Sequence, residues 1–197
     1  MNPDQRKNLE EMVDALGNSM ARAWSYFYVL KGFHEGAKAS PVVGDRFGWL
    51  LTEVWHGLFD AFFAKFGTLI DATSSTYSLP NMIKLVRRYG DADLKSLIPE
   101  AEVCISDKDG PIAKIRNWRH AHVAHRTVRG DEDTFYFENK MNLGQIEAAL
   151  KQLDEAINHL SWNVLAIHND TSSAFEPLVE QGKALFSAVA GGMVEEK

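Results

Sequence analysis

Helical spacing is the feature that most limits the folds open to this chain of 197 residues. Apolar side chains recur at intervals of three and four residues along most of the sequence, which places them on one face of an α-helix. No run of useful length alternates apolar and polar residues, and no hairpin dipeptide joins two such runs. The sequence therefore predicts an all-α fold, an antiparallel bundle of four to five main helices.

Capping residues, prolines and glycines set the limits of the predicted helices. Asp4, Ser78 and Asn142 each precede an apolar-periodic segment and are predicted to cap it. We expect helices at about 4–36, 45–66, 79–89, 91–105, 111–127, 143–167 and 174–190, the fourth broken before Pro99. The segments predicted between them include a connector at 37–44, a polar loop at 71–78 and a short extended piece at 135–138.

Length agrees with one globular domain over residues 1–197, which ends in the C-terminal helix predicted at about 174–190. Hydrophobic residues make up 45% of the chain and charged residues 24%, which excludes wholesale disorder. The net charge of −6 argues against bulk coating of DNA but leaves room for a local basic site. No leader segment and no apolar run of about 20 residues is visible, so we expect a cytoplasmic protein outside the membrane.

Several conspicuous residues are predicted to be structural. The single cysteine, Cys104, excludes an internal disulfide and is expected to be a buried thiol. The aromatic residues between positions 47 and 66 are expected to form core rather than a platform for base stacking. His56, His159 and His168 stand alone in the sequence, so we expect satisfied or surface histidines rather than ligands.

One segment departs from the amphipathic pattern. Residues 116–126 hold three arginines and three histidines. In the predicted helix one face reads Ile112, Ile115, Arg119, His122 and Arg126. The first half of this face is apolar and its second half is cationic. Because polar side chains here continue an inward stripe, we expect them to face a cleft or an interface.

Arginine and histidine together suit the cleavage of RNA without a metal. A guanidinium binds phosphate through a planar fork that stays charged, and an imidazole gives or takes a proton near neutral pH. A base frees the 2′-hydroxyl to attack the adjacent phosphate, an acid protonates the leaving oxygen, and arginine stabilises the developing charge. This chemistry needs no cofactor, and we expect none.

The same residues resemble the signature of the HEPN superfamily. That signature is an arginine, a polar residue, four further residues and a histidine on a helix of an all-α bundle. Arg119, His120 and His125 fit this spacing, and the closing run from Ala124 to Arg126 is also typical. More specifically, the chain is similar to the abortive-infection AbiU branch.

Two further stretches carry the similarity to the AbiU branch. Residues 63–71 resemble the middle helix of that branch, and residues 77–80 resemble the start of its next helix. Together with the helix after Asn142, the resemblance covers about residues 5–168.

The resemblance implies a metal-independent endoribonuclease, in phage defence or as a toxin, with RNA as substrate. It further implies a homodimer whose two motif helices form one cleft, and an antitoxin protein as a possible partner. It assigns phosphate stabilisation to Arg119, proton transfer to His125 and the polar position to His120. The supporting or substrate-binding residues would be His122, Arg116, Asn117 and Arg126. Arg119 and His125 are about 120° and about 9 Å apart on a straight helix, which suits a cleft shared by two copies.

The register of the motif has an alternative. Arg116, Asn117 and His122 satisfy the same spacing three residues earlier. The register of Arg119 and His125 is preferred because the typical run Ala-His-Arg ends there.

Two other functions compete with the nuclease. His122 and His125 could bind a metal ion, joined by His120 or a distant carboxylate. The same helix could also belong to a catalytically inactive module that binds RNA or a protein. Elsewhere, three cations at Lys84, Arg87 and Arg88 would extend an RNA track if their helix lies beside the motif helix.

Overall fold

The computed structural model describes residues 1–106, 108–120 and 138–195. Over these residues the secondary structure is helical and contains no strand. The elements are α1 (Pro3–Ala39), α2 (Pro41–Leu69), α3 (Leu79–Tyr89), α4 (Ala92–Ser96), α5 (Ile98–Ser106), α6 (Pro111–Trp118), α8 (Leu143–Leu165), a 3₁₀ turn (Ser173–Phe175) and α9 (Pro177–Glu195). The prediction of an all-α fold is therefore confirmed.

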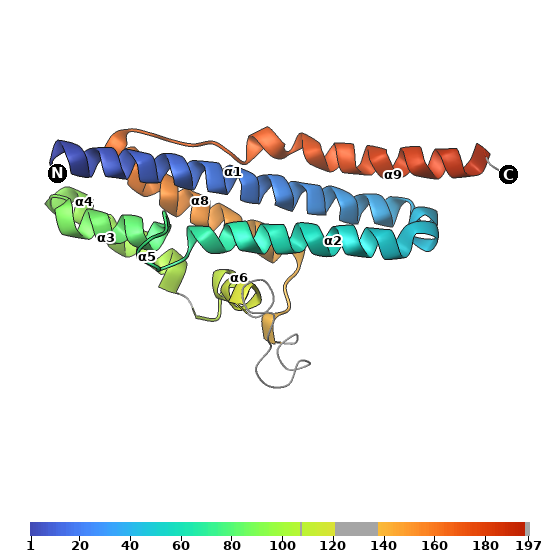
Figure 1. The fold of residues 1–197 in the computed structure, drawn as a ribbon, viewed down its shortest axis with the longest axis horizontal. Helices are drawn as coiled ribbons and strands as arrows, with labels where there is room; N and C mark the ends of the chain where they lie inside the picture. Colours follow the sequence, from blue (N-terminus) through green and yellow to red (C-terminus); the bar gives the residue numbers. More distant parts are fainter. Residues whose placement is uncertain (107, 121–137, 196–197) are drawn as a thin grey trace.

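The two longest helices, α1 and α2, form an antiparallel hairpin that runs along the molecule (Figure 1). Ser40 alone separates them, with φ −132° and ψ 70°. Pro41 then begins α2 in the first turn, where its missing N–H needs no partner. The predicted connector at 37–44 is wrong, because helix takes up all of it except Ser40.

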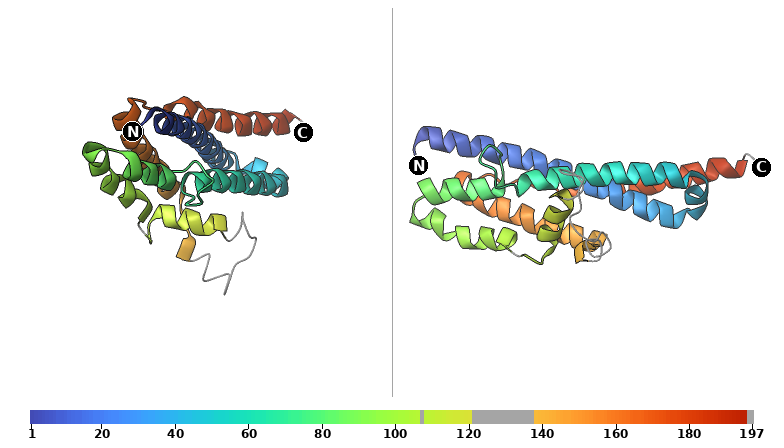
Figure 2. Two further views of the ribbon diagram at one scale, coloured as in Figure 1. Left: turned by 60° about the vertical axis from the view of Figure 1, so that its left-hand side comes forward. Right: turned by 60° about the horizontal axis from the view of Figure 1, so that its bottom comes forward.

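The other helices divide between the two halves of this hairpin. The half near the N-terminus carries α8 and the short helices α3, α4 and α5, whereas α9 runs beside the rest of α1 (Figures 1 and 2). The helix α6 lies against α2, α5 and α8. Within the described residues no helix combines the length and the hydropathy that crossing a bilayer requires.

The core lies between α1, α2 and α8. Its largest fully buried aromatic side chains are Trp24, Phe27, Phe62, Phe63 and Phe66. The predicted apolar stripe of α8 is buried against them at Ile146, Leu150, Leu153, Ile157 and Leu160. The expectation that the aromatic residues at 47–66 form core holds near the end of α2 but is wrong for Trp49, which is 88% exposed. The first half of α2 packs on α1 and, more weakly, on α9, which leaves its outer side chains in solvent.

The starts of the long helices depend on asparagine. Asn2, rather than the predicted Asp4, caps α1: its side chain accepts a hydrogen bond from the backbone N–H of Gln5. Asn142 caps α8 in the same way through Gln145, as predicted. In both cases the glutamine side-chain oxygen accepts a hydrogen bond from the backbone N–H of the asparagine, which completes a capping box.

The ends of the helices follow the sequence less closely. Leu97 separates α4 from α5, so the predicted break before Pro99 is confirmed. The helix α8 stops at Ala166, which adopts the left-handed conformation (φ 57°). The last helix continues through Gly191 and Gly192, where we expected it to have ended.

The predicted helix at 111–127 is described as far as His120. Residues 111–118 are α-helical, as predicted, and residues 119 and 120 continue as a π-helical turn. Of the predicted extended piece at 135–138, the first three residues lie outside the described part of the chain, and Glu138 is helical.

Candidate functional site

The helix α6 is held on the core by its apolar side. Ile112 and Ile115 are buried, as the stripe in the sequence predicts. Arg119 follows on the same face one turn later, since side chains three to four residues apart share a helix face. The apolar half of this face therefore fixes the position of Arg119.

Trp118 attaches the end of α6 to α2. Its ring stacks on Phe63 with 5.9 Å between the ring centroids and 5° between the planes, and it meets Phe59 edge-on. Its indole Nε1–H donates to the backbone carbonyl of Asn139 at 2.8 Å. The apolar face of the indole and its one hydrogen-bond donor thus both have partners.

Asn117, a candidate substrate-binding residue, has a structural contact. Its Nδ2 donates to Oδ1 of Asn139 at 2.9 Å. Asn139 is buried, so this bond and the bond from Trp118 tie the 138–140 segment to α6.

Arg116 points to a different neighbour from Arg119. Its guanidinium donates to the backbone carbonyl of Ile105 at 3.2 Å, near the end of α5. Although Arg116 is exposed, the structure directs it toward α5 and not toward the junction of α6 with α2.

Arg119 forms an ion pair with Asp71. The Nη2 atom of Arg119 lies 3.2 Å from Oδ2 of Asp71, across 48 positions of sequence. The side chains of Arg119 and Asp71 are 30% and 19% exposed. The pair is therefore half-buried, yet part of the arginine side chain remains open to solvent.

Gly67 makes room for Arg119. A Cβ atom at Gly67 would lie 1.9 Å from Cδ of Arg119, so the aliphatic part of the arginine crosses the α2 backbone directly. Gly67 lies in the last turn of α2, where a cation also meets the negative end of the helix dipole.

Thr73 fixes the orientation of the Asp71 carboxylate. The Thr73 backbone N–H and hydroxyl both donate to Oδ1, at 2.9 and 2.7 Å, which leaves Oδ2 for Arg119. These bonds from Thr73, followed by the positive charge of Arg119, hold the pKa of the Asp71 carboxyl below its ordinary value. Asp71 is therefore a carboxylate at neutral pH.

The loop that carries Asp71 is ordered by α3. Asn81 donates from Nδ2 to the backbone carbonyls of Thr73 and Thr76, at 2.6 and 2.8 Å. Ser78 stands at the N-cap of α3 but makes no side-chain cap, so the capping role we predicted for its side chain is wrong. Its hydroxyl donates instead to the backbone carbonyl of Asp71. The side chains of Asn81 and Ser78 thus hold in place the loop that pairs with Arg119.

Of the remaining motif residues, only His120 belongs to the described part of the chain. His120 is exposed and belongs to the π-helical turn with Arg119. His122, His125 and Arg126 lie outside the described residues, so their roles stay predictions.

The three cations of α3 have separate neighbours. Lys84 donates to the backbone carbonyl of Ala72, and Arg87 pairs with Glu102 at 2.6 Å. The guanidinium of Arg88 lies over the ring of the adjacent Tyr89. α3 packs mainly on α1, α4 and α5 rather than on the described part of α6, which gives no support to an RNA track through these cations (Figure 1). The rest of the motif lies outside the described residues, so the track stays a prediction.

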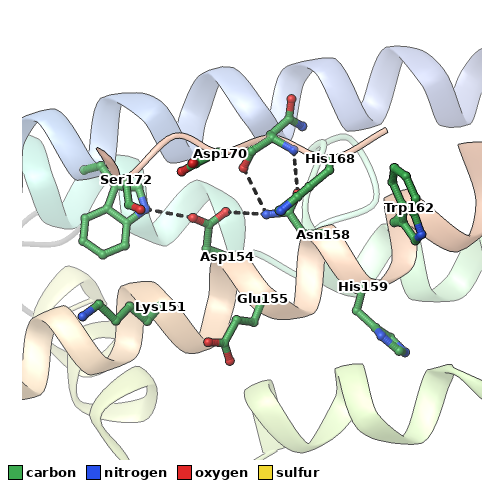
Figure 3. A pocket seen from close by; sticks show the side chains of 11 residues that line it. Lys151, Asp154, Glu155, Asn158, His159, Trp162, His168, Asp170 and Ser172 are labelled. Carbon is green, nitrogen blue, oxygen red and sulfur yellow. Dashed lines mark hydrogen bonds between the residues drawn. The ribbon is translucent and has the colours of Figure 1, made fainter. Parts of the chain in front are cut away.

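An open groove of about 800 Å³ follows α8 and the 168–172 segment, and no residue of α6 lines it (Figure 3). At its centre Asp154 accepts hydrogen bonds from Trp24 and Asn158, at 3.1 Å each. Burial raises the pKa of the Asp154 carboxyl. Asn158 also bonds the backbone of Asn169, so this network fastens the segment after α8 onto the bundle.

The residues expected to be structural have defined places. Cys104 is a buried thiol, as predicted, with Sγ 3.5 Å from the backbone carbonyl of Gln152. Burial raises its pKa to about 12. His56 and His168 are exposed, as expected. His159 Nε2 is buried and lies 3.4 Å from a carboxylate oxygen of Glu100 without a hydrogen bond to the described residues, so the expectation of a satisfied histidine is wrong there.

The comparison with known protein families gives one match, to AbiU2, a family of HEPN proteins, over residues 6–185. The chain belongs to this family. The match spans nearly the whole helical bundle, from α1 into α9, and includes both Asp71 and Arg119. No curated protein and no solved structure matches the chain. The expected similarity to the AbiU branch of the HEPN superfamily is therefore confirmed, and the all-α bundle is the fold of an AbiU2 family member.

The alternative of a metal site gains nothing from the described part of this AbiU2 protein. There, no three side chains of His, Cys, Asp or Glu come together as metal ligands. His122 and His125, the proposed ligands, lie outside that part, so the metal alternative remains a prediction to be tested with a chelator.

Reasoning from sequence missed the surroundings of Arg119. Asp71 and Gly67 lie in the stretch that resembles the AbiU middle helix, but nothing in its spacing indicates a partner in α6. Asn139 was missed for the same reason, although it joins two motif residues. The one available signal was that Arg119 continues an apolar stripe, which calls for a buried counter-charge.

Proposed function

We propose that this chain is a metal-independent endoribonuclease of the HEPN type. The 2′-oxygen of RNA attacks the adjacent phosphorus, and the bond from phosphorus to the 5′-oxygen breaks. The products are a 2′,3′-cyclic phosphate and a 5′-hydroxyl that takes up a proton. In this mechanism Arg119 stabilises the charge that develops on the phosphate, and His125 transfers a proton.

The observation that carries the proposal is the setting of Arg119 in an AbiU2 family bundle. The arginine of the motif is partly open to solvent and held in one orientation by Asp71 and Gly67. By contrast, Arg116 and Asn117 of the alternative register contact Ile105 and Asn139. These contacts favour the register of Arg119 and His125, with His120, His122 and Arg126 as supporting residues.

The biological role and the partners follow from the family. We propose that the protein acts in phage defence or in a toxin–antitoxin system, with an antitoxin protein as its regulator. RNA is the substrate, and a cytoplasmic location fits it. We further propose a homodimer in which two copies of the motif segment complete one cleft, because a straight α-helix would separate Arg119 from His125 by about 120°.

The test is cleavage of a labelled pool of single-stranded RNA in EDTA. The wild type is compared with Arg119→Ala, His125→Ala and Arg116→Ala. Cleavage in chelator that is lost in the first two variants and kept in the third supports the proposal and its register. A substrate with 2′-deoxy nucleotides should resist cleavage, because it lacks the attacking oxygen. Loss of activity in EDTA, restored by zinc, would instead support the metal site.

A matched control removes an arginine elsewhere. Arg87 also pairs with a carboxylate, that of Glu102, but on the basic helix α3. The variant Arg87→Ala should cleave RNA at the wild-type rate. This result would show that the effect of Arg119→Ala is specific to Arg119 and does not follow from the loss of any paired arginine. Light scattering of the same proteins tests the homodimer.

One observation favours a second function, an inactive module that binds RNA or a protein through the same helix. The charge of Arg119 is already compensated by Asp71, as expected for an arginine with a purely structural role. Equal, zero cleavage by wild type and all variants, with oligonucleotide binding retained, would support this function.

A further inference from the structure

We propose that Asp71 is the positioning residue of Arg119: it holds the guanidinium in the orientation in which Arg119 meets the scissile phosphate. This inference rests on the proposed ribonuclease function and adds to it a residue outside the motif. It starts from one juxtaposition, in which the end of α2 and the end of α6 meet through the Asp71–Arg119 pair.

The path of the arginine is fixed along its length. The absence of a side chain at Gly67 lets Cγ, Cδ and Nε of Arg119 lie directly against the α2 backbone. The stacked ring of Trp118, the preceding residue, fixes the backbone from which the side chain leaves. What remains free is the rotation of the guanidinium, and Asp71 restrains it through Nη2.

The carboxylate is itself a rigid partner. Both bonds from Thr73 go to Oδ1, so Oδ2 faces Arg119 in a set direction. The loop backbone is held in turn by Asn81 and Ser78. A mobile surface carboxylate would restrain an arginine little. The Asp71 carboxylate is instead held by Thr73, independently of its pair with Arg119.

The pair with Asp71 leaves Arg119 able to bind a phosphate. A guanidinium has five N–H donors in a fixed fork, and the bond to Asp71 uses one of them. The side chain is 30% exposed, which leaves room for a ligand beside it. A group that is already oriented needs less reorganisation when charge develops in the transition state.

The same carboxylate has an opposite effect on ground-state binding. Its negative charge lies beside the position of an anionic phosphate and repels it. Removing Asp71 should therefore slow the chemical step while it leaves RNA binding unchanged or makes it tighter. A merely structural residue would weaken both steps, and an autoinhibitory residue would speed cleavage when removed.

The experiment compares wild type with Asp71→Ala and Asp71→Asn in two measurements, one of rate and one of affinity. One is the single-turnover rate of RNA cleavage in EDTA, and the other is the Kd for a 2′-deoxy oligonucleotide that cannot be cleaved. For Asp71→Ala we expect a rate at least 10-fold lower with a Kd equal to or below that of wild type. Asparagine keeps an oxygen acceptor, so Asp71→Asn should recover part of the rate. Faster cleavage, or an equal loss in rate and affinity, would overturn the proposal.

A third measurement does not depend on catalysis. ¹⁵N relaxation of the Arg119 Nε–H group reports the mobility of the guanidinium. We expect an ordered group in wild type, a mobile one in Asp71→Ala and an intermediate one in Asp71→Asn. Unchanged order in Asp71→Ala would overturn the positioning role. If wild type cleaves no RNA, the proposed ribonuclease fails, and this measurement still decides whether Asp71 positions Arg119.

The matched control is Glu102→Gln. This variant removes one carboxylate from an exposed arginine pair on α5 and α3, so the net charge changes by the same amount. It should leave the cleavage rate, the Kd and the order of Arg119 at their wild-type values. Thermal melting of every variant shows whether the fold is intact, and Asp71→Asn keeps the test decisive if Asp71→Ala unfolds.

Discussion

The rings of Trp118 and Phe63 lie parallel, 5.9 Å apart at their centroids, and join the end of α6, just before Arg119, to the hairpin of α1 and α2. Phe63 is fully buried, whereas Trp118 lies at the edge of the core. The contact therefore transmits the position of α2 to Arg119, the next residue in the chain.

We expect Trp118→Ala to lower both stability and activity. Loss of the partly buried ring should reduce the free energy of unfolding by about 2–4 kcal/mol. Trp118→Phe keeps an aromatic ring but loses the bond to Asn139, and should cost about 1 kcal/mol. Urea unfolding of the three proteins measures both changes. Equal stability of wild type and Trp118→Ala would contradict the role of this contact.

We expect Gly67→Ala to displace Arg119 and reduce RNA cleavage at least 10-fold. The new methyl group would occupy the place of Cδ of Arg119, a flexible side chain that can move away from Asp71. Gly57→Ala is the matched control on the same helix, because a Cβ there meets open space. It should raise stability by about 0.5–1 kcal/mol and leave cleavage unchanged. Cleavage assays and thermal melts check both variants, and full activity of Gly67→Ala would show that Arg119 does not need this path.

The Asp71 carboxyl should make stability depend on pH in the acid range. Thr73 and Arg119 lower its pKa in the folded protein below the ordinary value of 3.8. A carboxyl with a lowered folded pKa stabilises the fold above its unfolded pKa, and this contribution is lost as the pH falls through the folded pKa. The stability of wild type relative to Asp71→Asn should therefore be constant from pH 7 to about 5 and decline below pH 4. Urea unfolding across this range measures the difference, and a gap that widens toward low pH would be the wrong sign.

The thiol of Cys104 should resist alkylation in the folded protein. Its pKa of about 12 keeps it protonated at pH 8, and its burial blocks access. We expect mass spectrometry to find no labelling by iodoacetamide under native conditions and complete labelling in guanidinium chloride. Rapid labelling of the native protein would show that α5 opens away from α8.

The helices were predictable where a local pattern decides them. The apolar stripes of α1 and α8 and the proline-led starts of α3 and α6 all follow from periodicity and helix-end preferences. The predictions failed where neighbours decide. The hairpin at Ser40 opposes local preference, and packing of α2 on α1 compensates for it. The helical course through Gly191 and Gly192 also opposes local preference, but both glycines are exposed with nothing packed against them, so packing does not explain it.

The all-α class follows from apolar periodicity, and the resemblance to the AbiU branch of the HEPN superfamily follows from short runs of residues, so both could be predicted from the sequence. The contacts of Arg119, by contrast, depend on how the helices pack. Its partner Asp71 lies 48 positions away in a polar loop, and Gly67 offers an absence of side chain that no pattern marks. An ion pair between distant elements depends on how their helices pack, and local spacing carries no record of that packing.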